Sequence, residues 1–125
     1  MKGRTHLKKQ ILIVDDDDGI QETLQAALED EGYEAICAED GVSALEKLET
    51  ATPALILLDL MMPRMDGYTF AQHLRQRGRL PAIPLLVLTA HGQAAQRARQ
   101  LGANDYLEKP FEIELLLEKV ASLVA

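Results

Sequence analysis

A chain of 125 residues with 47% hydrophobic residues fits one domain with one core and leaves little room for a second. The formal net charge of -7 argues against direct binding to nucleic acid, because such surfaces need clustered Lys and Arg. The single basic cluster of the sequence forms an extension over residues 1–9, to which we assign no function: Lys2, Arg4, Lys8 and Lys9.

Two further features bear on the compartment of the protein. The four strongly apolar residues Ile11 to Val14 precede four aspartates, and this run is too short for a signal-peptide core or a membrane span. We therefore expect a cytoplasmic protein. The one cysteine, Cys37, cannot form an intrachain disulfide, and its apolar setting predicts a buried core thiol.

Short apolar runs alternate along the chain with longer segments of helical spacing. The runs predict five strands, at residues 11–14, 34–38, 54–58, 84–88 and, more weakly, 104–107. At least three of them are apolar throughout, which is typical of strands covered on both faces of a parallel sheet.

The segments between these strands predict five helices. The first two carry apolar stripes, and Pro53 helps to end the second. The third runs from about Gly67 to Arg77, and the fourth from Gln93 to Leu101 with Gly102 as its stop. The last runs to Ala125. The stripes are Ile20, Leu24, Ala27 and Leu28; Val42, Leu45 and Leu48; and Ile113, Leu116, Leu117, Val120, Leu123 and Val124.

Five β/α pairs predict a single α/β domain over residues 10–125, an open doubly wound sheet with helices on both faces. Right-handed crossovers restrict the topology, and the common strand order for this size is 2-1-3-4-5. Ligands of such sheets bind beyond the carboxyl ends of the strands, between strands 1 and 3.

Five polar residues follow or end the predicted strands at this edge: Asp15, Asp16, Asp59, Thr89 and Lys109. Two unit charges about 4 Å apart repel by about 4 kcal/mol at an effective dielectric near 20, so three carboxylates here require a cation. Mg²⁺ fits because it uses one or two carboxylates, keeps several waters and takes phosphoryl oxygens. Lys109 supplies a second positive charge.

Asp59 is the residue best placed to act as a nucleophile toward phosphorus, once a metal and Lys109 neutralise the incoming group. The turn residues of the following loop, residues 60–67, predict a carboxylate open to solvent. Thr89 can bond to a phosphoryl oxygen, which gives its loop two positions and predicts a switch.

Other polar residues have simpler interpretations. Asp17 or Asp18 fits an N-cap at the start of the first helix, where the helix dipole favours negative charge. The histidines His6, His73 and His91 have no partners at metal-ligand or catalytic-triad spacing, so we select none of them as the phosphorylated residue.

Four stretches together resemble the response-regulator receivers of two-component systems (CheY-like): residues 11–17, 57–67, 87–90 and 105–111. The resemblance covers nearly the whole chain and implies the flavodoxin-like fold. It also implies phosphotransfer from a phosphohistidine to Asp59, and pairing of Lys109 with the phosphoryl group. Mg²⁺ is then bound by Asp16, Asp59 and the backbone carbonyl of Met61, with Asp15 acting through water.

The resemblance further implies that Tyr106 changes rotamer as Thr89 moves, and that the bond before Pro110 is cis. Met61 and His91 occupy positions that tune the removal of the phosphoryl group by water. The implied partners are a histidine kinase or histidine phosphotransfer protein docking near Ile20, a downstream effector or attached output domain, and a phosphorylation-dependent second copy. Such a domain is not an enzyme and promotes only its own phosphorylation and dephosphorylation.

Three other functions remain to be weighed. A flavodoxin-type redox protein shares the fold, but four aspartates after the first strand would repel a flavin phosphate. A phosphatase with an aspartyl-phosphate intermediate usually carries a second acidic residue where this chain has Met61, and the chain lacks length for a cap. A degenerate receiver that serves only for docking would have lost some of Asp16, Asp59, Thr89 or Lys109, and all four are present.

Overall fold

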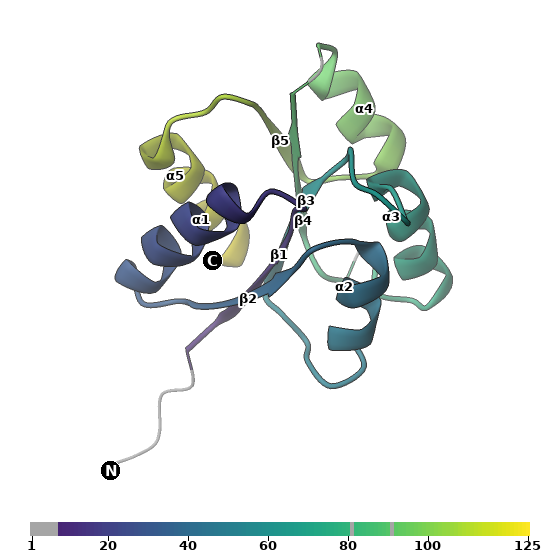
Figure 1. Cartoon of the computed structure of the whole chain (residues 1–125), viewed down its shortest axis with the longest axis horizontal. Coiled ribbons are helices and arrows are strands. Elements are labelled where there is room, and N and C mark those ends of the chain that lie inside the picture. Colours follow the sequence, from purple (N-terminus) through teal and green to yellow (C-terminus); the bar gives the residue numbers. More distant parts are fainter. Residues whose placement is uncertain (1–7, 81, 91) are drawn as a thin grey trace.

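The computed structural model describes residues 8–80, 82–90 and 92–125, so His6, His91 and most of the basic extension lie outside the described residues. Strands and helices alternate along the chain (Figure 1). The strands are β1 (Gln10–Val14), β2 (Glu34–Ala38), β3 (Leu55–Asp59), β4 (Leu85–Thr89) and β5 (Asp105–Glu108). The helices are α1 (Asp18–Asp30), α2 (Gly41–Lys47), α3 (Gly67–Gln76), α4 (Ala94–Leu101) and α5 (Ile113–Val124).

The five strands form one parallel sheet in the order β2-β1-β3-β4-β5, which confirms the predicted topology. The register aligns Val14 with Leu58, and Leu58 with Val87. β1, β3 and β4 therefore end at the same edge of the sheet. The strand order reverses between β1 and β3, so the residues that follow these two strands lie at the switch point.

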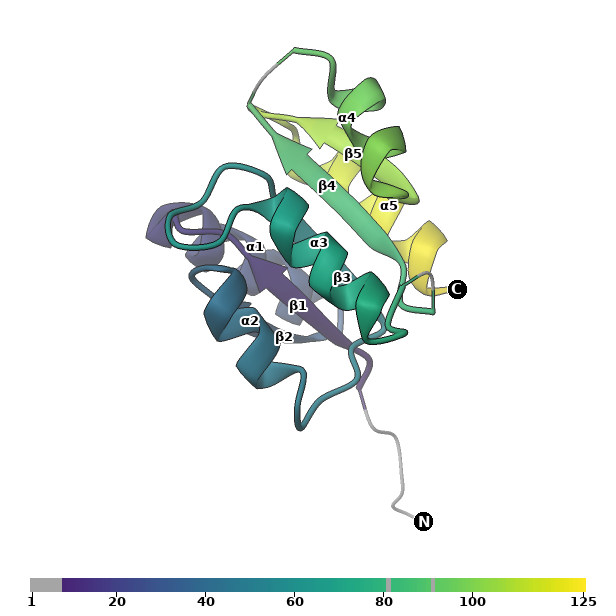
Figure 2. The same cartoon turned by 90° about the vertical axis from the view of Figure 1, so that its right-hand side faces the viewer.

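Helices cover both faces of the sheet, with α1 and α5 on one side and α2, α3 and α4 on the other (Figures 1 and 2). Alternate residues of each central strand enter different cores, as the pleat requires. Leu12 and Leu58 pack on the side of α2 and α3, whereas Ile13 and Leu57 pack on the side of α1 and α5. The all-apolar strands are thus buried on both faces, as predicted.

Aspartates begin three of the helices at the edge of the sheet where the strands end. Asp17 accepts a hydrogen bond from the Ile20 N–H at 3.1 Å, which confirms its expected role as N-cap of α1. Asp40 caps α2 through the Ser43 N–H, and Asp66 caps α3. These caps fix where each helix leaves the loops around the site.

Two expectations about burial were wrong. Val42 is 39% exposed, because the buried stripe of α2 runs through Gly41, Ala44 and Leu45 and leaves Val42 outside it. Cys37 is only half-buried, because it lies on the edge strand β2, with its Sγ 3.8 Å from Gln25 Oε1. No helix among the described residues is long and apolar enough to cross a membrane.

Candidate functional site

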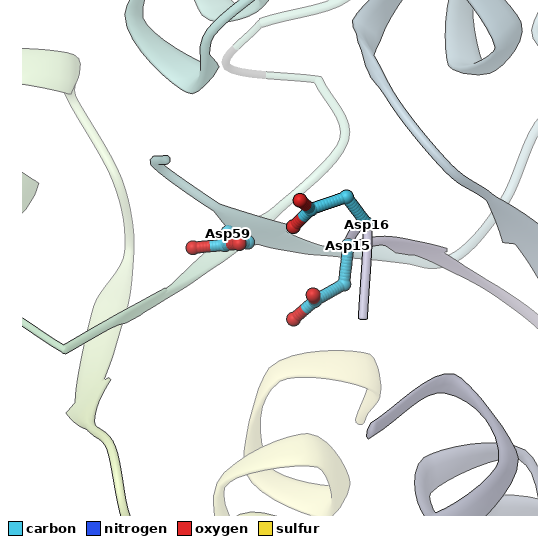
Figure 3. A group of neighbouring side chains, drawn as sticks. All are labelled: Asp15, Asp16 and Asp59. Atoms are coloured by element: carbon cyan, nitrogen blue, oxygen red, sulfur yellow. The ribbon is translucent and has the colours of Figure 1, made fainter. Parts of the chain in front are cut away.

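Three carboxylates meet at the edge of the sheet where β1 and β3 end. Asp15 and Asp16 follow β1 directly, and Asp59 is the last residue of β3. One carboxylate oxygen from each lies within 4.8 Å of the other two. Figure 3 shows Asp15 and Asp16 extending from the end of β1 on the side where Asp59 lies. Asp15 and Asp59 are buried and Asp16 is exposed, so the cluster opens to solvent on the side of Asp16.

Lys109 is the cation of this cluster. Its Nζ lies 2.9 Å from Asp15 Oδ2 and 3.6 Å from Asp59 Oδ2. The backbone places it there, because the Lys109 N–H donates to the Thr89 carbonyl at 2.8 Å and so holds the end of β5 against β4. One ammonium facing three carboxylates leaves the cluster negative. The donor set of hard oxygens therefore fits a divalent cation such as Mg²⁺.

Asp59 has an unusual environment for a carboxylate. It is only 5% exposed. Burial, followed by the negative charge of Asp15, raises its pKa to about 6 from an ordinary value of 3.8. The Met61 N–H, which donates to Asp59 Oδ1 at 3.2 Å, and the Lys109 ammonium oppose this rise. The ionised form of Asp59 is therefore unfavourable in free energy in this position, and a bound cation would stabilise it.

The expectation that the loop would leave Asp59 open to solvent was wrong. The Gly67 N–H donates to the Leu60 carbonyl at 3.1 Å and closes the base of the loop, residues 61–66. Gly67 packs so tightly that a Cβ there would lie 2.8 Å from Leu60 Cα and 2.9 Å from the Asp59 carbonyl oxygen. This close approach requires glycine and holds the start of α3 against the backbone at the end of β3.

Thr89 and Tyr106 lie on the neighbouring strands β4 and β5. Thr89 is the last residue of β4 and is fully buried. Tyr106 of β5 is 37% exposed, and the Nζ of Lys119 lies 6.0 Å from the centroid of its ring. The Lys109–Pro110 bond is cis, as expected. His73 lies on α3, away from the carboxylates by its place in the fold.

Sequence reasoning missed one pair beside the site. Asp40 is buried, and Arg64 of the loop after β3 donates from Nε to its Oδ2 at 2.6 Å. The Asp-Gly step between a strand and a helix could have indicated Asp40 as an N-cap. Arg64 carried no such signal, because its left-handed backbone (φ 65°) is unusual for this residue type.

A family model described as the response regulator receiver domain matches residues 11–121. The chain belongs to this family. This match confirms the resemblance inferred from the sequence motifs. Receivers are phosphoacceptor signalling domains and not conventional enzymes. The flavodoxin-type redox function and the phosphatase function are set aside by this membership.

Relatives and solved structures agree with this assignment. The receiver is 43% identical over 117 residues to the response regulator MprA of Mycobacterium ulcerans (strain Agy99), covering 92% of this chain and 50% of that protein. It therefore spans about half the length of the curated relatives it matches. The chemotaxis response regulator CheY4 of Vibrio cholerae superposes with a TM-score of 0.86 at 33% identity, covering 94% of this chain and 99% of that one. The response regulator TrrA of Thermotoga maritima, in complex with Mg²⁺-BeF, superposes with a TM-score of 0.81 at 35% identity, covering 92% of this chain and 98% of that one.

Proposed function

We propose that this receiver, residues 10–125, accepts a phosphoryl group on Asp59 in a Mg²⁺-dependent reaction. The observation that carries the proposal is the meeting of Asp59 with Asp15, Asp16 and Lys109 at the switch point of the sheet. Burial and the negative charge of Asp15 raise the pKa of Asp59 to about 6. It is about nine-tenths ionised at pH 7, so a nucleophilic oxygen is available at neutral pH.

Mg²⁺ would be held by Asp16, Asp59 and the backbone carbonyl of Met61, with Asp15 contributing through water. The carboxylate oxygens of Asp15, Asp16 and Asp59, within 4.8 Å of one another, support a metal site here. The similar receiver TrrA in complex with Mg²⁺-BeF supports the choice of Mg²⁺. When bound, Mg²⁺ neutralises charge on the carboxylates and on the incoming phosphoryl oxygens.

Asp59 and the residues around it have separate roles in the transfer. An Asp59 oxygen forms the new bond to phosphorus, while the bond between phosphorus and the donor histidine nitrogen breaks and its electron pair stays on the imidazole. The Lys109 ammonium pairs with a phosphoryl oxygen, which frees it from the aspartates it contacts at 2.9 Å and 3.6 Å. The Thr89 hydroxyl moves to another phosphoryl oxygen, and Tyr106 changes rotamer with it.

A histidine kinase or histidine phosphotransfer protein would supply the phosphoryl group. A groove of about 640 Å³ lies beside Lys109, and its lining includes Ile20, Thr23 and Phe111. This groove joins the start of α1 to the segment before α5, and it suits the apolar side of a helical partner that presents a phosphohistidine. A downstream effector, an attached output domain or a second copy of the receiver would read the phosphorylated state.

Intact-protein mass after incubation with acetyl phosphate tests the proposal. We expect one phosphoryl adduct in the wild type, dependent on Mg²⁺, and none in Asp59→Asn. A folded wild type that forms no adduct, even with a histidine-phosphorylated donor, would favour a receiver that serves only for docking.

A further inference from the structure

The loop between β3 and α3, residues 61–66, is fixed where it leaves the site. The Gly67 N–H closes its base on the Leu60 carbonyl, and the Met61 N–H donates to Asp59 Oδ1 at 3.2 Å. The backbone of Met61 therefore lies between the carboxylate of Asp59 and the outer part of the loop. A change in the outer part can move the Met61 carbonyl relative to Asp59.

The outer part of the loop is held by a second element, the start of α2. Arg64 reaches Asp40 with two nitrogens: Nε donates to Oδ2 at 2.6 Å, and Nη2 pairs with the same oxygen. Met65 packs beside Gly41 so closely that a Cβ on this glycine would lie 2.8 Å from the Met65 side chain. The loop and the start of α2 belong to the same side of the sheet (Figure 2). We call the contact of Arg64 with Asp40 the clasp.

The clasp has the features of a constrained contact. The Asp40 side chain is only 3% exposed and also caps α2 through the Ser43 N–H at 2.9 Å. Burial raises its pKa, but the Ser43 N–H and the Arg64 guanidinium outweigh burial and hold the pKa below its ordinary value. Arg64 adopts left-handed backbone with φ 65°, which is unfavourable for an L residue and needs a compensating contact.

We infer that Arg64 is a positioning residue for the metal site: its clasp on Asp40 fixes the β3–α3 loop and thereby the Met61 carbonyl beside Asp59. This inference rests on the proposed function, because it assumes that Asp59 and the Met61 carbonyl hold Mg²⁺. Arg64 itself contacts neither metal nor phosphoryl group. Its loss weakens Mg²⁺ binding by leaving the loop free to take other positions.

Arg79 provides a matched control. It donates from Nη2 to the Leu48 carbonyl at 2.6 Å, at the end of α2, so it also ties a loop to this helix. The loop it ties enters β4 at the opposite edge of the sheet from the carboxylates. Arg79→Ala thus removes a comparable arginine contact from α2 without touching the loop after Asp59.

The experiment measures Mg²⁺ affinity by isothermal titration calorimetry without phosphodonor, and the rate of phosphorylation by acetyl phosphate against Mg²⁺ concentration. We expect Arg64→Ala to raise the Mg²⁺ dissociation constant about 10-fold, as loss of an outer contact of a metal site does. The Mg²⁺ concentration for half-maximal rate rises by the same factor, while the rate at saturating Mg²⁺ stays at the wild-type value. Arg79→Ala stays within about twofold of wild type in both measurements.

Two further variants separate the clasp from the fold. Asp40→Asn keeps the helix cap, since Asn caps as well as Asp, but removes the nearer of the two carboxylate charges that Arg64 pairs with. The other is Glu39, whose Oε1 lies 3.7 Å from Arg64 Nη2. We expect Asp40→Asn to weaken Mg²⁺ binding, and the double variant with Arg64→Ala to add less than the sum of the two. Arg64→Lys keeps the charge without the planar fork, so we expect an intermediate affinity. If Arg64→Ala does not fold, the Mg²⁺ affinity of Arg64→Lys tests the inference instead.

The outcomes are distinguishable. If wild type binds Mg²⁺ and Arg64→Ala binds it equally well, or if Arg79→Ala weakens binding to the same extent, the positioning role is overturned and the proposed function stands. If wild type binds no Mg²⁺, the proposed metal site fails, and the inference about Arg64 fails with it.

Discussion

Asp59→Asn should stabilise the metal-free protein, although it abolishes the proposed phosphorylation. The pKa of Asp59 is about 6 in the folded protein against an ordinary value of 3.8. This difference corresponds to about 3 kcal/mol by which the folded state is penalised for holding the ionised carboxylate. Asn has nearly the same shape and can still accept the Met61 N–H, but it carries no charge against Asp15.

The pH dependence follows from the direction of the shift. Because the folded-state pKa is raised, the favourable contribution of a protonated Asp59 is present below about pH 4 and is lost as the pH rises through about 6. The gain in unfolding free energy on Asp59→Asn should therefore be near zero at pH 4 and approach about 3 kcal/mol at pH 7.5. For a domain of this size, that gain corresponds to a rise in Tm of about 10 °C.

Urea unfolding followed by circular dichroism, in EDTA at pH 4 and pH 7.5, measures the effect. Asp16→Asn is a matched control, since it removes a carboxylate from the same cluster at an exposed position and should gain less. A gain for Asp59→Asn that is equal at both pH values, or a variant less stable than wild type at pH 7.5, would refute the electrostatic account of the site.

Three other predictions concern the reaction itself. Lys109→Ala should lower the rate of phosphorylation by acetyl phosphate about 100-fold, because the cation facing the phosphoryl oxygens is lost; a rate within twofold would remove Lys109 from the mechanism. Ile20→Glu should slow transfer from a histidine-phosphorylated protein at least about tenfold and leave acetyl phosphate unaffected, because it disrupts only docking in the groove; equal slowing of both donors would contradict this. Met61→Asn should speed the loss of the phosphoryl group, because Met61 is 54% exposed beside Asp59 and a smaller polar side chain admits water. An unchanged rate of loss in a mass-spectrometric time course would count against this prediction.

The convergence of the site could be predicted from the sequence because it depends on strand periodicity and on the rule for parallel sheets. Asp15, Asp16 and Asp59 each stand where an apolar run ends, and in a parallel sheet such ends share one edge. The N-cap role of Asp17 was equally local. These features need only the order of elements along the chain.

The parts that could not be predicted depend on contacts between distant segments. Asp59 is buried beside Asp15 and Lys109, which come from distant parts of the chain, and the turn-like sequence after Asp59 does not reveal this. Arg64 and Asp40 are 24 residues apart, and Arg64 adopts a left-handed backbone that nothing in the sequence near it indicates. The partial exposure of Cys37 depends on β2 being an edge strand.

The central claim is that Asp59 carries the phosphoryl group. Borohydride reduction of the phosphorylated protein converts an aspartyl phosphate to homoserine, and peptide mapping then locates the modified residue. We expect homoserine at position 59 alone, formed only when Mg²⁺ and phosphodonor are both present. Homoserine at position 15 or 16, or a phosphoryl group found on a histidine with Asp59 intact, would contradict the account.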